Sequence, residues 1–436
     1  MYQIAFICAI TVLMYWRSIR YQAVSDDVPG LANPLPFKNK FHKAWLEWYA
    51  CSKYDLKRAH VLTLLTHMAV CVMIYVAFGK TNVSLLMATM FCVNPITSQV
   101  SVWISGRSYG VTALLMLLSL AFPFLAPATF LGILYSPMGF FSPLAYIGSN
   151  VWYLALLIPI FWAIHYKRIK GIVLERVKSQ AVAYDKKFTF KKFVIALKTL
   201  GFYFTLSIVP YRLSFYHSFM QSFSGVNVER KNAERVDGFF FVGLAVILFV
   251  LYSAVKCWTP VSWGVMWFVV CIAPYCNFIR MNQEIAERYA YIASIGSMFA
   301  LATIIYPYPA LFVAFITYYA TRTWYFMPAY TDDFIITEYS CMEDPKAWYC
   351  WFVRANKMFN NKCIREALNL FMTANILSPG QFKVLFNIGI ILKIIKKDEE
   401  GNKFLEEAKK HVIAGQEEDV KKIFKTVEDG ARPLFI

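Results

Sequence analysis

The stretch HVLTLLTHMAVCVMIYVAF, residues 60–78, contains no Asp, Glu, Lys or Arg. Its length is close to the roughly 20 apolar residues that a helix needs to cross a membrane. The whole chain shares this character, because 58% of its 436 residues are hydrophobic and only 16% are charged. Typical soluble domains contain about 25% charged residues. The composition therefore predicts an all-α, polytopic membrane protein.

Apolar stretches on both sides of residues 60–78 predict about 11 membrane helices in total. Residues 2–16 form a short first span without a clear cleavage site, so we expect this span to be retained. Residues 108–165 contain no Asp, Glu, Lys or Arg and are long enough for three passes. The other spans are expected at 82–93, 193–210, 238–256, 258–279 and 289–321, the last divided in two at YPYP.

Basic residues set the expected orientation. Residues 166–192 carry nine Lys and Arg against two acidic residues, which favours the cytoplasm. Counting helices back from this stretch puts loop 17–58 outside, although that loop is also basic. Either the topology differs from this count, or an external basic surface holds an anionic ligand such as a lipid phosphate. The formal net charge of +17 is thus interpreted as membrane contact, with no nucleic acid partner.

The character of the sequence changes after the membrane domain, which we place at residues 1–321. A connector, 322–345, leads into an amphipathic tail, 346–436, that matches itself at an offset of about 34 residues, the tetratricopeptide period. The first copy is marked by Trp351, Ala355, Ala367, Phe371, Ala374 and Pro379. The second copy is marked by Leu385, Gly389, Gly401, Leu405 and Ala408. We expect two repeats and a capping helix, with a generic helical hairpin as the alternative.

Three polar stretches fall on the expected external face. They are VSDDVPGLANP (24–34), VNPITSQVSVWISGRSYG (93–110) and RMNQEIAERYAYIASIG (280–296). Arginines and carboxylates at the rim of a membrane bundle are functional candidates, because burying such charges is energetically expensive. Loop 211–237 is expected on the same face. Its aromatic residues and His217 are interpreted as an interfacial aromatic belt in preference to a sugar site.

Five stretches, taken in order, resemble one family of membrane enzymes. They are DDVPGLANP (26–34), AHVLTLLTHMAVCVMIY (59–75), NPITSQVSVWISGR (94–107), ERYAYIASIG (287–296) and TRTWYFMPAYTDDF (321–334). In order and spacing they are similar to the transmembrane and tetratricopeptide-repeat containing O-mannosyltransferases and their bacterial relatives. These enzymes belong to the GT-C superfamily of polyprenyl-phosphate-dependent glycosyltransferases. Each stretch is short, so the resemblance depends on their order over nearly the whole chain.

The resemblance implies a GT-C-like membrane domain and an inverting sugar transfer on the extracytoplasmic face. The donor would be a polyprenyl-phosphate-linked hexose, and the acceptor would be a hydroxyl of a protein or glycan. A carboxylate must deprotonate or orient this acceptor. Asp26 is the first candidate for this role and Asp27 the second. One of the two could instead orient its neighbour or bind a divalent metal, and no other cofactor is expected.

Cations must stabilise the phosphate group that leaves, and the planar fork of arginine suits this task. Arg107 and Arg288 are the candidates, with Lys38 and Lys40 in support. The alternative for both arginines is snorkelling toward lipid headgroups. Glu287 is expected to pair with Arg288.

The chain departs from the pattern of this family at several polar positions. Relatives usually carry His-Pro, a second His and a Glu in the stretch before the tryptophan, where this chain has Asn94 before a proline, then Thr97 and Gln99. Tyr109 replaces a common Asp. Asn94 and Gln99 can hydrogen-bond a sugar, and with Tyr291 they are supporting candidates. Neutral side chains cannot do the same acid–base work, so the resemblance fixes neither a metal requirement nor the donor.

The cysteines and helical histidines are given packing roles. The ten cysteines include no C-x-x-C pair, and several, such as Cys71, Cys92 and Cys271, lie in apolar runs. They are interpreted as membrane-embedded thiols, with neither a disulfide framework nor a metal site. His60 and His67 are expected to be packed residues of one helix.

Other classes of function stay open at this stage. A non-catalytic scaffold could recruit protein partners through the repeats, and a lipid-linked glycan transporter or polymerase could also use many helices with charges at their rim. Convergence of Asp26, Arg107 and Arg288 on one external cavity would favour the transferase, and dispersal would favour the scaffold. We expect a bacterial inner membrane, with the repeats outside, in preference to the endoplasmic reticulum.

Overall fold

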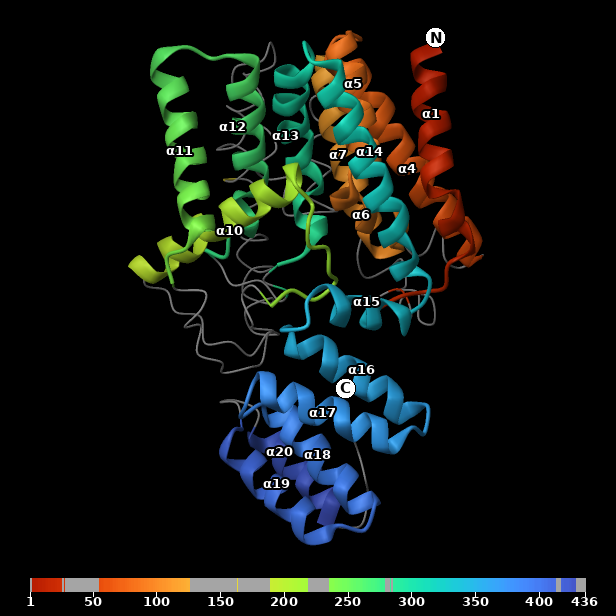
Figure 1. Cartoon of the computed structure of the whole chain (residues 1–436), viewed down its shortest axis with the longest axis vertical. Helices are drawn as coiled ribbons and strands as arrows, with labels where there is room; N and C mark the ends of the chain where they lie inside the picture. Colours follow the sequence, from red (N-terminus) through yellow and green to blue (C-terminus); the bar gives the residue numbers. More distant parts are fainter. Residues whose placement is uncertain are drawn as a thin grey trace.

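The computed structural model describes residues 2–25, 55–125, 189–218, 235–278, 285–412 and 417–428, together with Asp27, Ala163 and Gln283. The regular secondary structure of these residues consists of α-helices and short 3-10 helices, and no strand occurs among them. The expected all-α class is therefore confirmed. Figure 1 shows one group of helices that run roughly side by side and a second group that contains the end of the chain.

The first group contains the candidate membrane spans. Its helices are α1 (Tyr2–Tyr15), α4 (Leu56–Ala77), α5 (Asn82–Val93), α6 (Ser98–Val102), α7 (Arg107–Ala121), α10 (Phe190–Ile208), α11 (Gly238–Lys256), α12 (Pro260–Ile272), α13 (Ala290–Ile305) and α14 (Pro309–Phe326). Short 3-10 turns accompany them: η1 (Trp16–Arg20), η4 (Pro95–Thr97), η5 (Ile104–Gly106), η6 (Pro123–Leu125), η11 (Ala273–Tyr275), η12 (Glu287–Tyr289) and η13 (Met327–Tyr330). The turn between α13 and α14 coincides with YPYP, as the sequence predicted.

Five helices among the described residues are long and apolar enough to cross a membrane. Helix α5 and the segment 95–102 make a sixth if this bent pair is one span. The chain is therefore compatible with a multi-pass membrane protein. Residues 126–162 and 164–188, where part of the predicted passes fall, lie outside the described residues, so the total of about 11 spans stays a prediction.

Helix α10 departs from the span expected at 193–210. It is not among the helices that are apolar enough to cross a membrane, because it carries Lys191, Lys192 and Lys198. Lys198 is buried and pairs with Asp237, the N-cap of α11, with 2.7 Å between Nζ and Oδ2. Figure 1 shows α10 inclined across α11 and α12 instead of parallel to them.

Glycines allow the helices of the first group to approach closely. A Cβ on Gly243 of α11 would lie 2.0 Å from the carbonyl oxygen of Leu197 in α10. A Cβ on Gly296 of α13 would lie 2.3 Å from the carbonyl oxygen of Gly264 in α12. Both distances are far below van der Waals contact, so only glycine fits. Small residues at helix crossings are typical of membrane bundles, whose helices are held by close packing.

A bend of 60° separates α5 from the segment 95–102. Pro95 has no N–H to continue the helix, and the side-chain oxygen of Asn94 accepts a hydrogen bond from the amide of Ile96 at 3.0 Å. Asn94 Nδ2 also donates to the carbonyl oxygen of Ser207 in α10 at 2.9 Å. The bend turns the polar stretch that follows away from the line of α5.

The second group consists of short amphipathic helices. They are α15 (Ile335–Glu343), α16 (Trp348–Asn360), α17 (Ile364–Leu377), α18 (Phe382–Ile394), α19 (Asp398–Lys410) and α20 (Glu417–Glu428). Helix α16 packs on α17 and α18 packs on α19, and α20 covers the second pair. These two helical pairs follow the period of about 34 residues in the sequence.

Small residues lie at the helix crossings of the second group, as the sequence predicted. Ala355, Ala367 and Ala374 are fully buried in the core of α16, α17 and α18. In the second pair, a Cβ on Gly401 would lie 2.8 Å from the carbonyl oxygen of Gly389. Close crossings of this kind leave the space between the helices to bulkier side chains.

Polar contacts join the two groups. Asp344, directly after α15, accepts hydrogen bonds from the amide and hydroxyl of Ser218, both at 2.7 Å. Asp333, directly before α15, accepts a hydrogen bond from the amide of Ser25 at 2.8 Å and pairs with Lys357 of α16. The second group is thereby fixed to loops at one end of the first group.

Candidate functional site

The three polar stretches meet at one end of the first group. Helix α1 ends, α13 begins and the bent segment after α5 runs toward the end that faces α15 (Figure 1). Trp103 is buried where they meet. Its Nε1 donates to the carbonyl oxygen of Val24 at 3.0 Å, and the guanidinium of Arg288 lies over its ring, 5.0 Å from the centroid. One aromatic side chain therefore connects all three stretches.

Asp27 is held against the turn that follows Trp103. It is only 1% exposed. Its Oδ1 accepts hydrogen bonds from the amide and hydroxyl of Ser105 at 2.9 and 2.7 Å, and its Oδ2 accepts one from the amide of Ile104 at 3.3 Å. Burial outweighs these hydrogen bonds and raises the pKa of Asp27 to about 7. The carboxyl group can therefore take up or release a proton near neutral pH.

The burial of Asp27 distinguishes it from an ordinary carboxylate in a solvated loop, which the sequence alone could not do. The other carboxylate of the predicted pair, Asp26, lies outside the described residues, and so do Lys38 and Lys40. The roles given to these three residues stay predictions.

Arg288 is fixed by contacts on two sides. Its backbone amide donates to Oε1 of Gln99 at 2.8 Å, and its Nη2 donates to Oε1 of Gln283 at 2.7 Å. The guanidinium also lies 5.0 Å from the centroid of the Tyr289 ring, on top of its contact with Trp103. Gln99 therefore contacts the backbone of Arg288, and the guanidinium is held by Gln283 and by two aromatic rings.

Glu287 does not pair with Arg288, contrary to the sequence-based expectation. Its Oε1 accepts a hydrogen bond from the amide of Ser214 at 2.6 Å and lies 3.4 Å from Nε2 of His217. Neighbours in the sequence point to different sides of a 3-10 turn, so Glu287 and Arg288 face different partners. The side chains of Glu287 and His217 are both almost completely buried. The sequence suggested that His217 belongs to an interfacial aromatic belt, and its burial against Glu287 does not fit that interpretation.

Several buried polar atoms around this pair lack a hydrogen-bond partner among the described residues. They are Oε2 of Glu287, Nδ1 of His217 and the hydroxyl of Tyr330. The charges of Glu287 and Arg288 both act on the Tyr330 hydroxyl, which places all of these groups in one neighbourhood. Buried polar atoms without a protein partner are uncommon, and they indicate a place where a polar ligand or water is bound.

Arg107 occupies a different position from Arg288. It begins α7, is 3% exposed, and its Nη1 donates to the carbonyl oxygen of Ala59 in α4 at 3.2 Å. It lies two residues after Ser105, whose amide donates a hydrogen bond to Asp27. Arg107 is therefore near the cluster in the chain, but its guanidinium reaches toward α4.

Two of the supporting candidates lie apart from the cluster. Asn94 shapes the bend after α5, as described above. Tyr291 points into the first group, where its hydroxyl lies 2.8 Å from Nδ1 of His67. His60 and His67 are both buried, as expected of packed helical residues.

Sequence reasoning missed the central part played by Trp103, and also Gln283 and Tyr330. Trp103 lies within one of the quoted stretches, and a tryptophan among small and polar residues beside an Arg could have drawn attention to it. Gln283 and Tyr330 carry no comparable signal, because they act through contacts made across the fold.

Among the described residues, one group of His, Cys, Asp and Glu side chains is close enough to hold a metal ion: His67, Cys71 and Cys92. It lies within the helices and includes no residue of the Trp103 cluster. A divalent metal at Asp26 and Asp27 stays a prediction. In comparisons with known proteins, no family model, no curated protein and no solved structure matches this chain.

Proposed function

We propose that this chain is an integral-membrane glycosyltransferase that moves a hexose from a polyprenyl-phosphate donor to an acceptor hydroxyl on the extracytoplasmic face, with inversion. The observation that carries the proposal is the cluster around Trp103. Trp103 contacts the guanidinium of Arg288, and the turn directly after Trp103 binds Asp27, a buried carboxyl group with a pKa near neutrality. A general base and a cation for the leaving phosphate are the two groups that this reaction needs.

Arg288 would bind the phosphate of the donor. A guanidinium can hold two phosphate oxygens at once and neutralises the charge that develops as the lipid phosphate leaves. The rings of Trp103 and Tyr289 fix its plane. Arg107, with Lys38 and Lys40, would add positive charge around the phosphate and its lipid.

Asp27, or its neighbour Asp26, would take the proton of the acceptor hydroxyl. The hydroxyl oxygen attacks the anomeric carbon, the bond from that carbon to the phosphate oxygen breaks, and its electron pair leaves with the lipid phosphate. A base works best when its pKa is close to the operating pH, and the pKa of Asp27 meets this condition.

The pair of Glu287 and His217 would bind hydroxyl groups of the sugar or the acceptor. A sugar hydroxyl can donate to Oε2 of Glu287 and accept from a ring nitrogen of His217, which supplies the partners that these buried atoms lack among the described residues. Glu287 is also the alternative base if Asp26 and Asp27 prove dispensable.

The second group of helices would form two tetratricopeptide repeats and a capping helix that recruit a protein partner or acceptor. The contacts of Asp333 and Asp344 with the first group would hold these repeats beside the site. We infer a membrane domain of about 11 spans, in a bacterial inner membrane with the repeats outside.

A non-catalytic scaffold is the second candidate, and two observations favour it. The guanidinium of Arg107 reaches toward α4 instead of joining Arg288. Both carboxylate oxygens of Asp27 accept hydrogen bonds from the turn at Ile104 and Ser105. A carboxyl group held in this way needs no role other than fixing the loop. In that case the cluster would stabilise the face on which the repeats are mounted.

Transfer by the purified full-length protein in nanodiscs decides between the two. The parent, Asp26→Asn, Asp27→Asn and Glu366→Gln variants would be offered polyprenyl-phosphate hexoses with a panel of glycan and peptide acceptors. Glu366 is an exposed carboxylate of α17 and serves as the control. Transfer by the parent and control, with a loss of at least about 100-fold in one Asp variant, is expected.

Two other results would contradict the proposal in different ways. Full activity of both Asp variants would remove the pair from catalysis and transfer the role of base to Glu287. Lack of transfer by every protein, while lipid phosphate still binds to the parent and to the control, would favour the scaffold. Binding and melting temperature are measured on every variant, so that a folding defect is not mistaken for lost chemistry.

A further inference from the structure

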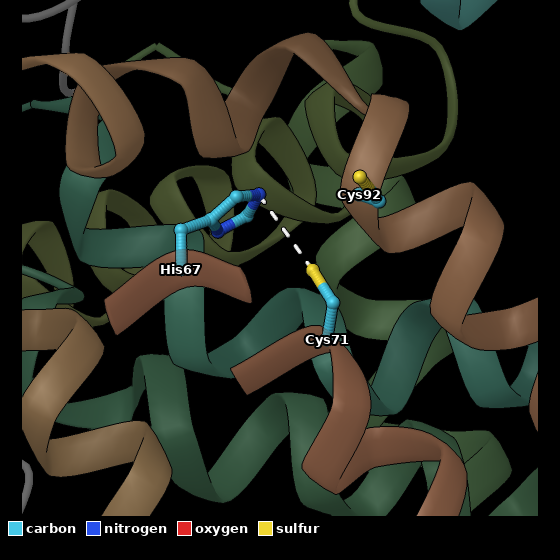
Figure 2. Close-up of side chains that lie close together, drawn as sticks. All are labelled: His67, Cys71 and Cys92. Carbon is cyan, nitrogen blue, oxygen red and sulfur yellow. Dashed lines mark hydrogen bonds between the residues drawn. The ribbon is translucent and has the colours of Figure 1, made fainter. Parts of the chain in front are cut away.

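Two helices of the first group place a histidine and two cysteines together. His67 and Cys71 are one helical turn apart on α4, and Cys92 lies on α5. All three side chains are buried. Their ligand atoms, one ring nitrogen and two sulfurs, lie within 4.8 Å of one another. Figure 2 shows His67 and Cys71 side by side, with Cys92 on the neighbouring helix.

The orientation of the imidazole suits a metal ligand. Nδ1 of His67 lies 2.8 Å from the hydroxyl of Tyr291, and Nε2 faces the sulfur of Cys71 at 3.7 Å. Metal-binding histidines commonly use one ring nitrogen for the ion and donate the other N–H to a partner that fixes the tautomer. The hydroxyl of Thr11 lies 3.3 Å from the sulfur of Cys92 and supports the third donor in the same way.

We propose that His67, Cys71 and Cys92 form a binding site for a soft metal ion, Cu(I). Three atoms that lie within 4.8 Å of one another share a point no more than about 2.8 Å from each of them. Metal–nitrogen and metal–sulfur bonds are about 2.0–2.3 Å long. Each donor atom therefore has to move inward by no more than about 0.5–0.8 Å.

The number and type of donors favour Cu(I) over Zn(II). Thiolates select soft ions such as Cu(I) and Zn(II), and imidazole suits both. Structural zinc sites almost always have four ligands, whereas Cu(I) is satisfied by two or three. The described residues supply three donors of the His, Cys, Asp and Glu types here.

The surroundings also favour a singly charged ion. The rings of Tyr15, Phe91 and Tyr291 pack around His67, with centroids 5.1–5.8 Å from its own. A net charge in such an apolar interior is expensive. Cu(I) bound to neutral His67 and to the thiolate of one of the two cysteines is neutral overall, the thiol proton being released to solvent on binding. The sulfur of the other cysteine then completes the site as the third donor.

Such an ion would link α4 to α5, the helix from which the bent segment with Gln99 and Trp103 continues. Its expected role is to fix these two helices relative to each other. This inference does not depend on the proposed transferase activity, because the site shares no residue with the Trp103 cluster.

Metal retention by the purified full-length protein tests the inference. The protein in detergent is incubated anaerobically with Cu(I) or with Zn(II), desalted, and analysed by mass spectrometry for metal per chain. The parent and the Cys271→Ser control, which removes a buried thiol of α12, are expected to retain about one copper per chain and to show thiolate-to-copper absorption. Cys71→Ser and Cys92→Ser are each expected to lose at least about tenfold in copper affinity against a Cu(I) chelator.

Bound Cu(I) should also raise the melting temperature of the parent and the control, but not that of Cys71→Ser. If Cys71→Ser does not fold, Cys92→Ser, which removes the other sulfur donor, decides the question. Copper retained equally by the parent and both variants would overturn the assignment of these ligands. Zinc retained in place of copper would overturn the choice of ion, and retention of neither metal would overturn the site.

Discussion

The two groups of helices treat charged side chains differently. In the second group, ion pairs such as Lys397–Glu400 and Lys410–Glu407 lie at the surface, and the core is built from aliphatic, aromatic and small side chains. In the first group, the charged residues Asp27, Arg107 and Glu287 are buried at or near one end. Buried charges are expensive and are seldom kept for packing alone. The comparison agrees with our proposal, which assigns packing and recognition to the second group and chemistry to the end of the first group.

The largest expected effect separates packing from chemistry. Phe371 is fully buried in the second group and contacts Phe352, with ring centroids 5.8 Å apart. Phe371→Ala should lower the free energy of unfolding of this group by about 3–5 kcal/mol, because it leaves a cavity. Thermal unfolding followed by limited proteolysis of the full-length protein measures the loss.

Ile376→Ala is the matched control, because Ile376 lies on the same helix and is 76% exposed. It should change the free energy of unfolding by less than about 0.5 kcal/mol. Equal losses in Phe371→Ala and Ile376→Ala would contradict the core assigned to this group.

Arg288 gives the next largest effect, on activity this time. Removal of one group that stabilises developing charge typically lowers the rate about 10²–10³-fold. Arg288→Ala should therefore lower sugar transfer by this amount and raise the concentration of donor needed. Arg365→Ala, which removes an exposed arginine of α17, should leave initial transfer rates unchanged. An Arg288→Ala protein with parental rates would disprove the role of this residue in phosphate binding.

A pair of cysteines tests on which side of the membrane the second group lies. The sulfurs of Cys341 in α15 and Cys350 in α16 are 3.1 Å apart and buried. If this group faces an oxidising compartment, exchange with a disulfide oxidant should join them: two thiols lose two protons and two electrons, and the oxidant becomes a dithiol. Closing so short a loop would stabilise the second group by about 2.5 kcal/mol.

Alkylation of the denatured protein from intact membranes, with and without prior reduction, measures this disulfide by mass. Two additional alkylated thiols should appear only after reduction, and Cys350→Ser should abolish the difference. Fully alkylated Cys341 and Cys350 without reduction would place the second group on the reducing side, against the predicted orientation.

The all-α class and the two helical pairs could be predicted because their signals repeat along the chain. Apolar runs mark the membrane helices, and small residues such as Ala367 and Gly401 recur at the period of the helical pairs. The span expected at 193–210 is not among the helices that are apolar enough to cross a membrane, because α10 begins before Lys191 and Lys192 and also contains Lys198, which is buried against Asp237. Local hydrophobicity does not reveal such a partner.

The candidate site could be predicted only in part. The polar stretches that carry Asp27 and Arg288 were identified, since charges beside apolar runs are conspicuous. The pairing of Glu287 with His217 and the central place of Trp103 depend on contacts between segments far apart in the chain, which no period in one sequence records. The spacing of His67 and Cys71 on one helix was visible, but Cys92 joins them only through the packing of α5 on α4.

The smallest expected effect is a dependence of the free energy of unfolding on pH, which Asp27 should give to the first group of helices. Burial raises its pKa from the ordinary 3.8 to about 7. Between these values the folded chain holds a proton that the unfolded chain has released, so the free energy of unfolding falls as the pH rises. The fall between pH 5 and pH 7 should be about 2 kcal/mol. Melting temperatures of the full-length protein at several pH values measure it.

Asp27→Asn removes this titration while keeping a side chain of similar shape, so its melting temperature should depend less on pH over the same window. Its amide can accept one hydrogen bond from the turn but loses the second acceptor oxygen, so the variant should be less stable than the parent at pH 5. The difference should shrink toward pH 7, where the parent carries a buried negative charge for half of the time. Parallel pH profiles for the parent and Asp27→Asn would mean that Asp27 stays ionised, and a base poised near neutrality would then have to be sought at Glu287.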